Sequence, residues 1–314
     1  MINKEKNFVS AVIYVRNAEH IIKDFVLHIA RELDKNFQHS EIICVNDAST
    51  DESVARLRLL ENEVENVSIT LLSLNRFHGK EAAMQGGLGL TVGDFVFEFD
   101  EVSPDIDVKD MMRLYTKSLE GFDIVAAVTG KTRGISSKLF YKLFNKSADI
   151  PYELMTEYFR ILSRRAINRI GSLNRIITYR KVAYASSGLK YATIEIAPVK
   201  TLLRESREER RFRRYLAADS VLMFTNLGFK FSVLMTGLMM VVMVGIVVYA
   251  LISRGLGITV PGWTSTVLLV AFGFFGLFGI LSIITKYLQL LMDVNVRKSA
   301  FTFESIEKIT RDGR

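Results

Sequence analysis

The sequence predicts an α/β domain built on a parallel sheet, followed by a hairpin of two membrane-spanning helices. Between residues 8 and 128, short apolar runs alternate with segments in which apolar residues recur at helical spacing. Such alternation is typical of parallel strands joined by right-handed helical crossovers. Farther along the chain, residues 231–252 and 262–285 contain no charged side chain. Each of these stretches exceeds the ~20 residues that span the apolar core of a bilayer.

The strands of the domain are predicted where apolar residues run together and polar or turn-forming residues follow. These runs are residues 8–15, 42–45, 67–72, 94–99 and 123–128, with a further strand at 190–196. Helices are expected up to residue 36 and at residues 54–65, 81–88, 110–118, 138–145 and 159–170. The helix that ends near residue 36 has the clearest period, because apolar residues recur along one of its faces. The result is an alternating strand–helix chain.

Composition and charge narrow the classes of function. The 314 residues are 49% hydrophobic, enough for a sizeable core, and the net charge is +7. A basic chain suits nucleic acid, an anionic membrane surface or a phosphate-rich substrate. The soluble part has no basic platform with interleaved aromatic residues, so nucleic acid is not an expected partner. Cys44 is the only cysteine and the four histidines are scattered, so neither a disulfide framework nor a histidine metal site is expected.

The chain divides into four predicted segments. Residues 1–199 form a cytoplasmic domain, residues 200–228 an amphipathic interfacial segment, residues 229–290 the two spans, and residues 291–314 a cytoplasmic tail. Basic residues flank the spans, which places both termini in the cytoplasm by the positive-inside rule. The alternative is a buried helical hairpin in a soluble protein. Soluble helices seldom reach this length without a charge, so membrane spans are favoured.

The arginine-rich segment before the first span allows two interpretations. It is either a helix lying on the cytoplasmic leaflet or a solvated helix held by pairs such as Arg204–Glu208. Direct continuity with a span favours the first. Small residues in the spans also permit close helix packing within or between subunits, so a homo-oligomer is possible. These small residues are Gly237, Gly245, Gly273, Gly276 and Gly279.

Polar residues follow two of the predicted strands. Residues 46–51, Asn-Asp-Ala-Ser-Thr-Asp, come after the run 42–45, and an acidic stretch from Asp100 follows the run 94–99. Ligands of open α/β sheets bind just outside the carboxyl ends of the strands, so both stretches are candidate site loops. A plain strand–turn–helix connection, with Ser49 or Asp51 capping the next helix, is the alternative for the first.

Four stretches of the chain, taken together, resemble the family-2 glycosyltransferases of the polyprenyl-phosphate type. They are residues 45–51, 79–81, 93–100 and 159–164 (Phe-Arg-Ile-Leu-Ser-Arg). The resemblance implies a Rossmann-like domain of the GT-A type that binds a nucleotide-diphosphate sugar. It also implies an inverting hexosyltransferase that loads a polyprenyl (undecaprenyl) phosphate at the cytoplasmic face. The paired spans resemble those of bacterial members, which implies a multi-pass protein of a bacterial-type inner membrane.

The same resemblance implies roles for individual residues. Those that would bind the nucleotide sugar are Val15, Asn17, Glu19, Asp47, Ser49 and Lys80. Asp100 and Glu101 would hold Mg²⁺ or Mn²⁺, since hard cations prefer carboxylate oxygens. The implied catalytic residues are Asp100, Glu157 and Arg160. The implied ligands of the acceptor phosphate are Arg133, Arg160 and Arg164.

The chain also departs from the family pattern. Val102 stands where the family's Asp-x-Asp-x-Gln motif has its second aspartate, and residues 203–214 contain no clean Gly-x-Ser-Lys-Tyr element. Three hypotheses therefore stay open. The chain is an active, divergent glycosyltransferase, or a catalytically weakened homologue that binds a nucleotide sugar or a partner protein, or a membrane scaffold that keeps only the fold. The basic and acidic residues retained at the matching positions favour the first hypothesis.

Overall fold

The structure is a computed structural model with two compact units. It describes residues 4–104, 106–129, 152, 155–173, 179–197, 262–296 and 302–310, with scattered residues between 210 and 252. Unit 1 comprises residues 1–145, 150–217 and 298–314, and unit 2 comprises residues 146–149 and 218–297.

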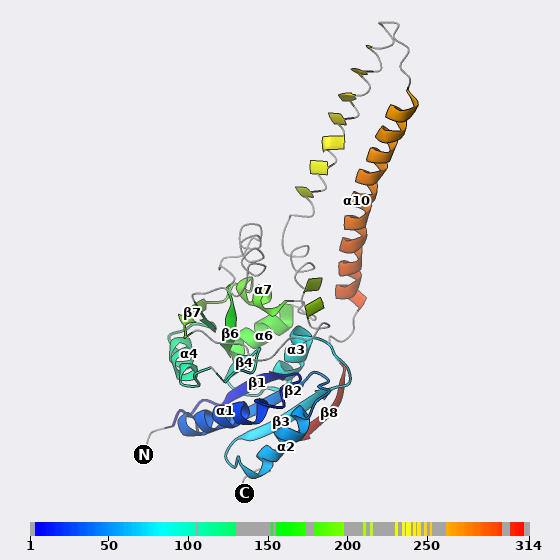
Figure 1. Ribbon diagram of the computed structural model, residues 1–314. Helices are drawn as coiled ribbons and strands as arrows, with labels where there is room; N and C mark the ends of the chain where they lie inside the picture. Colours follow the sequence, from blue (N-terminus) through cyan, green and yellow to red (C-terminus); the bar gives the residue numbers. More distant parts are fainter. Residues whose placement is uncertain are drawn as a thin grey trace. The chain divides into compact units, whose positions relative to one another are not determined.

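Unit 1 is organised around a sheet of eight described strands in the order β7-β5-β6-β4-β1-β2-β3-β8 (Figure 1). The strands are β1 (Val9–Val15), β2 (Ser40–Asn46), β3 (Ser68–Leu74), β4 (Phe95–Phe99), β5 (Ile124–Val128), β6 (Glu157–Ser163), β7 (Tyr191–Glu195) and β8 (Phe303–Lys308). The central strands β4, β1, β2 and β3 are mutually parallel, and β5 is parallel to β7. The predicted strand–helix alternation is thus confirmed for the centre of the sheet.

The sheet as a whole is mixed, which corrects the expectation of a parallel sheet. Strand β6 lies antiparallel between β4 and β5, and β8 lies antiparallel to β3. The prediction of one helix over residues 159–170 was wrong, because the structure places β6 there first and then helix α6 (Arg164–Leu173). Residues 157–162 are all buried, so an apolar run did not distinguish a fully buried strand from a buried helix.

Helices cover both faces of this sheet. The helical elements of unit 1, besides α6, are α1 (Ile22–Asn36), α2 (Ser53–Arg58), the 3₁₀ turn η1 (Leu59–Asn62), α3 (Lys80–Leu90), α4 (Asp110–Leu119) and α7 (Arg180–Ala185). Side chains of β1 alternate between two cores, as a strand requires: Ile13 packs with α1 and α4, and Val12 packs with α3, α6 and α7. The predicted helix at 138–145 lies outside the described residues.

Helix α3 lies unusually close to the sheet. A Cβ atom added at Gly87 would lie 2.5 Å from side-chain atoms of both Val12 and Val45. Only a residue without a side chain permits this approach of helix and sheet. The close packing fixes α3, whose first residue is Lys80, against β1 and β2.

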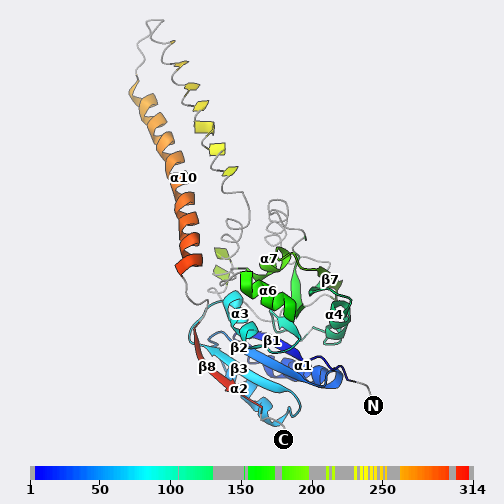
Figure 2. The same cartoon turned by 180° about the vertical axis from the view of Figure 1, so that it is seen from behind.

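The C-terminal segment contributes a strand to the sheet. Within residues 291–314, which were expected to form a tail, Phe303–Lys308 is β8 and pairs with β3 from Leu74↔Phe303 to Thr70↔Lys308 (Figures 1 and 2). The Arg58 guanidinium forms an ion pair with Glu307 at 2.9 Å. Strand β8 has mostly exposed side chains, so no apolar pattern in the sequence marked it.

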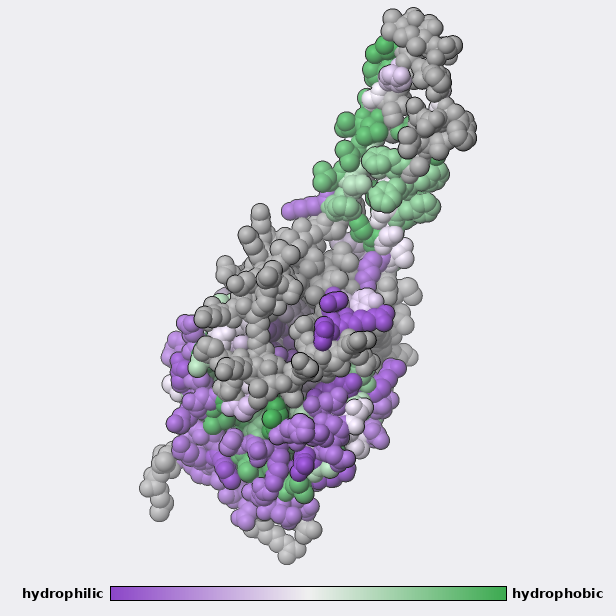
Figure 3. Space-filling view, viewed as in Figure 1, coloured by the Kyte–Doolittle hydropathy of each residue, from purple (hydrophilic) through white to green (hydrophobic). Residues whose placement is uncertain are grey.

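Unit 2 contains the two apolar stretches. Helix α10 (Trp263–Val296) includes the second of them, and described helical residues between 230 and 252 belong to the first. The stretches meet where a Cβ atom at Gly276 would lie 2.3 Å from the Met239 side chain. Apolar side chains are exposed along α10 (Figure 3), among them Phe272, Phe274, Phe275, Phe278, Leu281 and Leu288.

Two predictions concern this part of the chain: the membrane-spanning helices and the interfacial segment. Among the residues that the structure describes, no helix has both the length and the apolar character needed to cross a membrane. The expected interfacial segment at 200–228 lies almost entirely outside the described residues.

Candidate active site

The predicted nucleotide-binding residues meet at one edge of the sheet. Strands β1 to β4 are parallel, so the loops that follow them lie at the same edge. The loop after β1 carries Asn17 and Glu19, and the loop after β2 carries Asp47 and Ser49. Lys80 begins α3 after the β3 loop, and Asp100 directly follows β4. This is the edge at which open α/β sheets bind ligands.

Side chains interlock the loops after β1 and β2. The Asn17 backbone N–H donates to Ser49 Oγ at 3.1 Å, and the Glu19 N–H donates to Asp51 Oδ2 at 3.0 Å. Asp51 Oδ1 also accepts from the Ser53 N–H at 3.1 Å, which satisfies a donor at the start of α2. Asn17 adopts the left-handed conformation, with φ of 47°. The two loops therefore form one hydrogen-bonded ridge.

Asp47 holds the loop that leads into α3. Its side chain is fully buried, and its Oδ1 accepts from the His78 N–H at 2.8 Å while Oδ2 accepts from the Gly79 N–H at 2.9 Å and the Tyr14 hydroxyl at 3.0 Å. Burial raises the pKa of Asp47, and the hydrogen bonds from His78, Tyr14 and Gly79 offset only part of that rise. The structure thus shows Asp47 positioning the loop, and its direct contact with a nucleoside stays a prediction.

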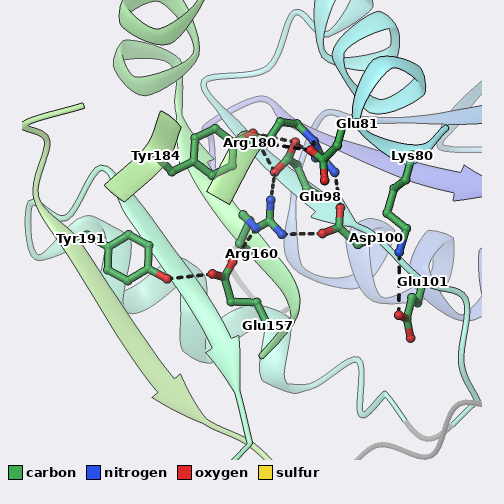
Figure 4. A network of polar contacts seen from close by, with 10 residues as sticks. All are labelled: Lys80, Glu81, Glu98, Asp100, Glu101, Glu157, Arg160, Arg180, Tyr184 and Tyr191. Carbon is green, nitrogen blue, oxygen red and sulfur yellow. Dashed lines mark hydrogen bonds and ion pairs between the residues drawn. The ribbon is translucent and has the colours of Figure 1, made fainter. Parts of the chain in front are cut away.

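Two carboxylates and two guanidinium groups form a buried network at the end of β4 (Figure 4). Arg160 on β6 donates to Glu98 Oε2 at 2.9 Å and to Asp100 Oδ2 at 2.5 Å. Arg180 on α7 donates to Glu98 Oε1 at 2.6 Å and to Asp100 Oδ1 at 2.6 Å. Every oxygen of the two carboxylates therefore accepts a charge-assisted hydrogen bond.

Further polar side chains surround this core. Arg180 Nε donates to Glu81 Oε2 at 2.9 Å, and the Tyr184 hydroxyl lies 2.9 and 3.0 Å from the two Glu98 oxygens. Arg160 Nε lies 2.9 Å from Glu157 Oε2, although neither atom has a hydrogen-bond partner among the described residues. This contact is an ion pair in which the N–H does not point at the oxygen.

The network keeps Asp100, Arg160 and Arg180 charged. Burial alone would raise the pKa of Asp100, but the attraction of Arg160 and Arg180 outweighs it and holds that pKa well below its usual range. Burial lowers the pKa values of both arginines, yet Asp100 and Glu98 raise them well above the usual value. Burial, together with the Glu98 carboxylate, raises the pKa of the Tyr184 hydroxyl.

The side chains at the end of β4 do not fit a divalent cation. Both Asp100 oxygens are bonded to arginines, and Glu101 Oε1 lies 3.8 Å from Lys80 Nζ. Val102 is 2% exposed and packs in the hydrophobic core where the family motif has a carboxylate. Across the described part of the chain, no three acidic, histidine or cysteine residues are grouped to hold a metal ion. Asp100 and Glu101, expected as metal ligands, are thus partners in ion pairs.

Comparison with known proteins identifies the family. Residues 10–171 match the profile described as "Glycosyl transferase family 2". The chain belongs to this family. Bacillus subtilis "Uncharacterized glycosyltransferase YkcC" is 23% identical, over 83% of this chain and 82% of its own. "Bactoprenol glucosyl transferase" of Shigella phage SfX is 28% identical over 172 residues, 52% of this chain and 54% of its own.

A solved structure supports the GT-A-like fold of this glycosyltransferase. Mannosyl-3-phosphoglycerate synthase from Rubrobacter xylanophilus superposes with a TM-score of 0.50 and 17% identity, covering 68% of this chain and 74% of the other. Identity this low shows the fold alone. The expected fold class of the N-terminal domain is therefore confirmed.

The structure places two of the residues expected at the acceptor site of this glycosyltransferase, Arg160 and Arg164, apart from each other. Arg164 donates to the Gly93 carbonyl at 2.9 Å and to Thr91 Oγ1 at 3.2 Å, just before β4 begins. Because β6 runs antiparallel to β4, four residues beyond Arg160 the chain has reached the opposite edge of the sheet. Arg164 therefore lies apart from Arg160, and its assignment to the acceptor phosphate stays a prediction. Arg133, the third expected ligand, lies outside the described residues.

The sequence analysis missed three members of the network: Glu98, Arg180 and Tyr184. Glu98, a carboxylate inside the apolar run 94–99, was a usable signal, because a charge in a buried strand needs a partner.

Proposed function

We propose that this family-2 glycosyltransferase moves a hexose, with inversion, from a nucleotide-diphosphate sugar to a polyprenyl phosphate. The observation that carries the proposal is the interlocked edge formed by the loops after β1, β2 and β3. It lies where open α/β sheets bind ligands, and it places Lys80 at the start of α3, beside the end of β4. The named bactoprenol glucosyl transferase relative supports the lipid phosphate as acceptor.

Lys80 is the described residue best placed to neutralise the leaving diphosphate. Its side chain is 34% exposed, and its ion pair with Glu101 is long, at 3.8 Å. Developing negative charge on the leaving group must be balanced by positive groups fixed in advance. Arg160 and Arg180 are fully buried and pair with Asp100 and Glu98. Their role is to hold these two carboxylates in place.

The acceptor makes few chemical demands. A phosphate monoester has its second pKa near ~6, so it is largely ionised at neutral pH and attacks without a strong general base. It needs positive charge and access to a lipid surface. Arg133 remains the predicted ligand for its phosphate, and the catalytic roles of Asp100 and Glu157 remain predictions.

We place this reaction at the cytoplasmic face of a bacterial-type inner membrane, with both termini in the cytoplasm. The charge-free stretches 231–252 and 262–285, their basic flanks and the exposed apolar side chains of α10 support this placement. A homo-oligomer remains a prediction. Gly276, one of the residues expected to permit close helix packing, contacts Met239 of the same chain.

Transfer by purified membranes tests the proposal. Membranes that contain the protein are incubated with undecaprenyl phosphate and labelled UDP-sugars or GDP-sugars, with and without a chelator. Lipid-linked label is expected. Because the donor set at β4 does not fit a cation, the chelator should leave the rate unchanged. If no common donor gives lipid-linked label, the enzyme proposal fails.

A second candidate is a catalytically weakened homologue that binds a nucleotide sugar. It is favoured by the full engagement of Asp100 by two arginines and by the burial of Val102. Under this alternative, titration calorimetry detects UDP or GDP binding while the transfer assay stays blank.

A further inference from the structure

We infer that Thr302, at the entrance to β8, positions the loop 75–79 and thereby sets the affinity of the site for the nucleotide. This inference rests on the proposed function, because it assumes that the loop leading into Lys80 contacts the donor. It assigns a positioning role to a residue more than 220 positions away from that loop in the sequence.

Thr302 contacts the loop through side chain and backbone. Its Oγ1 donates to Asn75 Oδ1 at 2.7 Å, and its carbonyl accepts from the Asn75 N–H at 3.4 Å. The Thr302 N–H donates to His78 Nε2 at 3.2 Å, and Thr302 Oγ1 lies 3.2 Å from the same nitrogen. Asn75 and His78 of the loop are therefore both bonded to Thr302, the residue that precedes β8.

The contacts fix the tautomer of His78. Its Nδ1 lies 2.6 Å from the Arg76 carbonyl, which can only accept, so Nδ1 carries the proton. Its Nε2 is then an acceptor, which matches the N–H that Thr302 presents to it. The imidazole thus bridges its own loop and β8 in one orientation.

Asp47 holds the same loop from the opposite side. It accepts from the backbone N–H groups of His78 and Gly79. The ring of His78 is therefore bonded to Thr302, and its backbone is bonded to the loop after β2. Gly79 has φ of 85°, a conformation that favours glycine, and Lys80 follows at once as the first residue of α3. The position of the Lys80 ammonium therefore depends on both anchors.

Strand β8 is firm enough to serve as an anchor. Beyond its pairing with β3, the Ile309 N–H donates to the Ile69 carbonyl at 2.8 Å, and the Ile69 N–H donates to Thr310 Oγ1 at 2.8 Å. Ile309 is 5% exposed. The strand is thus bonded to β3 along its length and fastened at its far end.

Substitutions at Thr302 and on β8 distinguish a loss of loop positioning from a general loss of stability. Thr302→Val keeps the shape but removes the hydroxyl bond to Asn75, whereas Thr302→Ser keeps it. Glu307→Gln, the matched control, breaks the Arg58 ion pair on the same strand, away from the loop. All variants are full chains, and UDP and GDP are titrated into each by calorimetry.

We expect Thr302→Val to weaken nucleotide binding by about threefold to tenfold, the size of one lost hydrogen bond. Thr302→Ser and Glu307→Gln should bind within about twofold of wild type on the same scale. Binding and strand anchoring are reciprocal, so UDP or GDP should also slow hydrogen exchange of the Thr302 amide in the wild-type chain.

The possible results are distinguishable. Equal binding by wild type and Thr302→Val overturns the inference and leaves the proposed function standing. Equal weakening by Thr302→Val, Thr302→Ser and Glu307→Gln also overturns it, because the strand would then act only through stability. If wild type binds neither UDP nor GDP, the proposed function fails and the inference fails with it.

Discussion

The two halves of the carboxyl edge of the sheet are built differently. At the ends of β1 and β2, polar side chains bond to backbone groups of neighbouring loops, and several of these residues are exposed. At the end of β4, charged side chains bond to one another, and Arg160, Arg180 and Glu98 are 0% exposed. The comparison indicates that the first half is shaped to receive a ligand, while the second half provides a rigid charged support.

Because of this difference, the two arginines near β4 are interpreted as part of the support and not as free positive charge. Four acidic residues, Glu81, Glu98, Asp100 and Glu157, face the two buried arginines, so the positive charge there is already compensated. Taking a charge out of water is costly unless a partner replaces the water, which makes each member dependent on the others. Ligand binding should therefore depend on the loops, and stability on the network.

The largest expected effect is the loss of a buried arginine. Arg160→Met removes one of the two guanidinium partners of Asp100 and Glu98, so their buried charge is only partly compensated, and the free energy of unfolding should fall by about 3–5 kcal/mol. Denaturant unfolding of the full chain measures the change. The matched control is Arg165→Met, since Arg165 pairs with Asp123 but its side chain is 68% exposed. That variant should lose clearly less stability, because an exposed ion pair contributes little, and equal losses in the two variants would contradict the difference between the two halves of the edge.

The second prediction concerns acid stability. The pKa of Asp100 is lower in the folded chain than in the unfolded chain, so its ionisation stabilises the fold fully above about pH 4. That contribution is lost as the pH falls from there toward the folded-state pKa. The unfolding free energy of the wild type should fall with acid more steeply than that of Asp100→Asn, by up to about 1.4 kcal/mol per pH unit.

Unfolding curves between about pH 2 and about pH 5 would test this, with Asp24→Asn, which changes an exposed carboxylate on α1, as the control. Parallel curves for wild type and Asp100→Asn would show that the arginines do not hold this carboxylate ionised.

The third prediction tests the ligand-binding half. Lys80→Met removes the exposed ammonium at the start of α3 and should weaken UDP or GDP binding about tenfold, with the stability unchanged. Lys117→Met serves as the control, because Lys117 pairs with Glu120 on the distant helix α4. Calorimetry measures the affinity of both variants for UDP and GDP. If Lys80→Met and Lys117→Met bind the nucleotide equally well, Lys80 is not part of the binding site.

The smallest expected effect is that of metal removal. Since both Asp100 oxygens are bonded to arginines, a chelator should not change nucleotide affinity, and Mn²⁺ added to the full chain should keep the electron paramagnetic resonance spectrum of the free ion. A loss of affinity that Mn²⁺ restores would show that Arg160 and Arg180 release Asp100 when the donor binds.

Much of the fold could be predicted because its signals are local. The runs at 8–15, 42–45 and 67–72 became β1, β2 and β3 with small shifts at their ends, since a strand buried on both faces needs a continuous apolar run. The polar residues after these runs also marked the ligand-binding edge. Strand β6 was missed as a strand because a short apolar run fits either element.

The sequence by itself determined the alternation of strands and helices, the polar strand ends and the charge-free stretches, because each depends on residues close together in the chain. Tertiary structure alone decided that Arg180 meets Asp100 from 80 residues away, that β8 completes the sheet beyond β3, and that Thr302 meets His78. Such pairings depend on which elements become neighbours. Their physical basis is the need of buried charges and backbone groups for partners, a need that local sequence cannot assign.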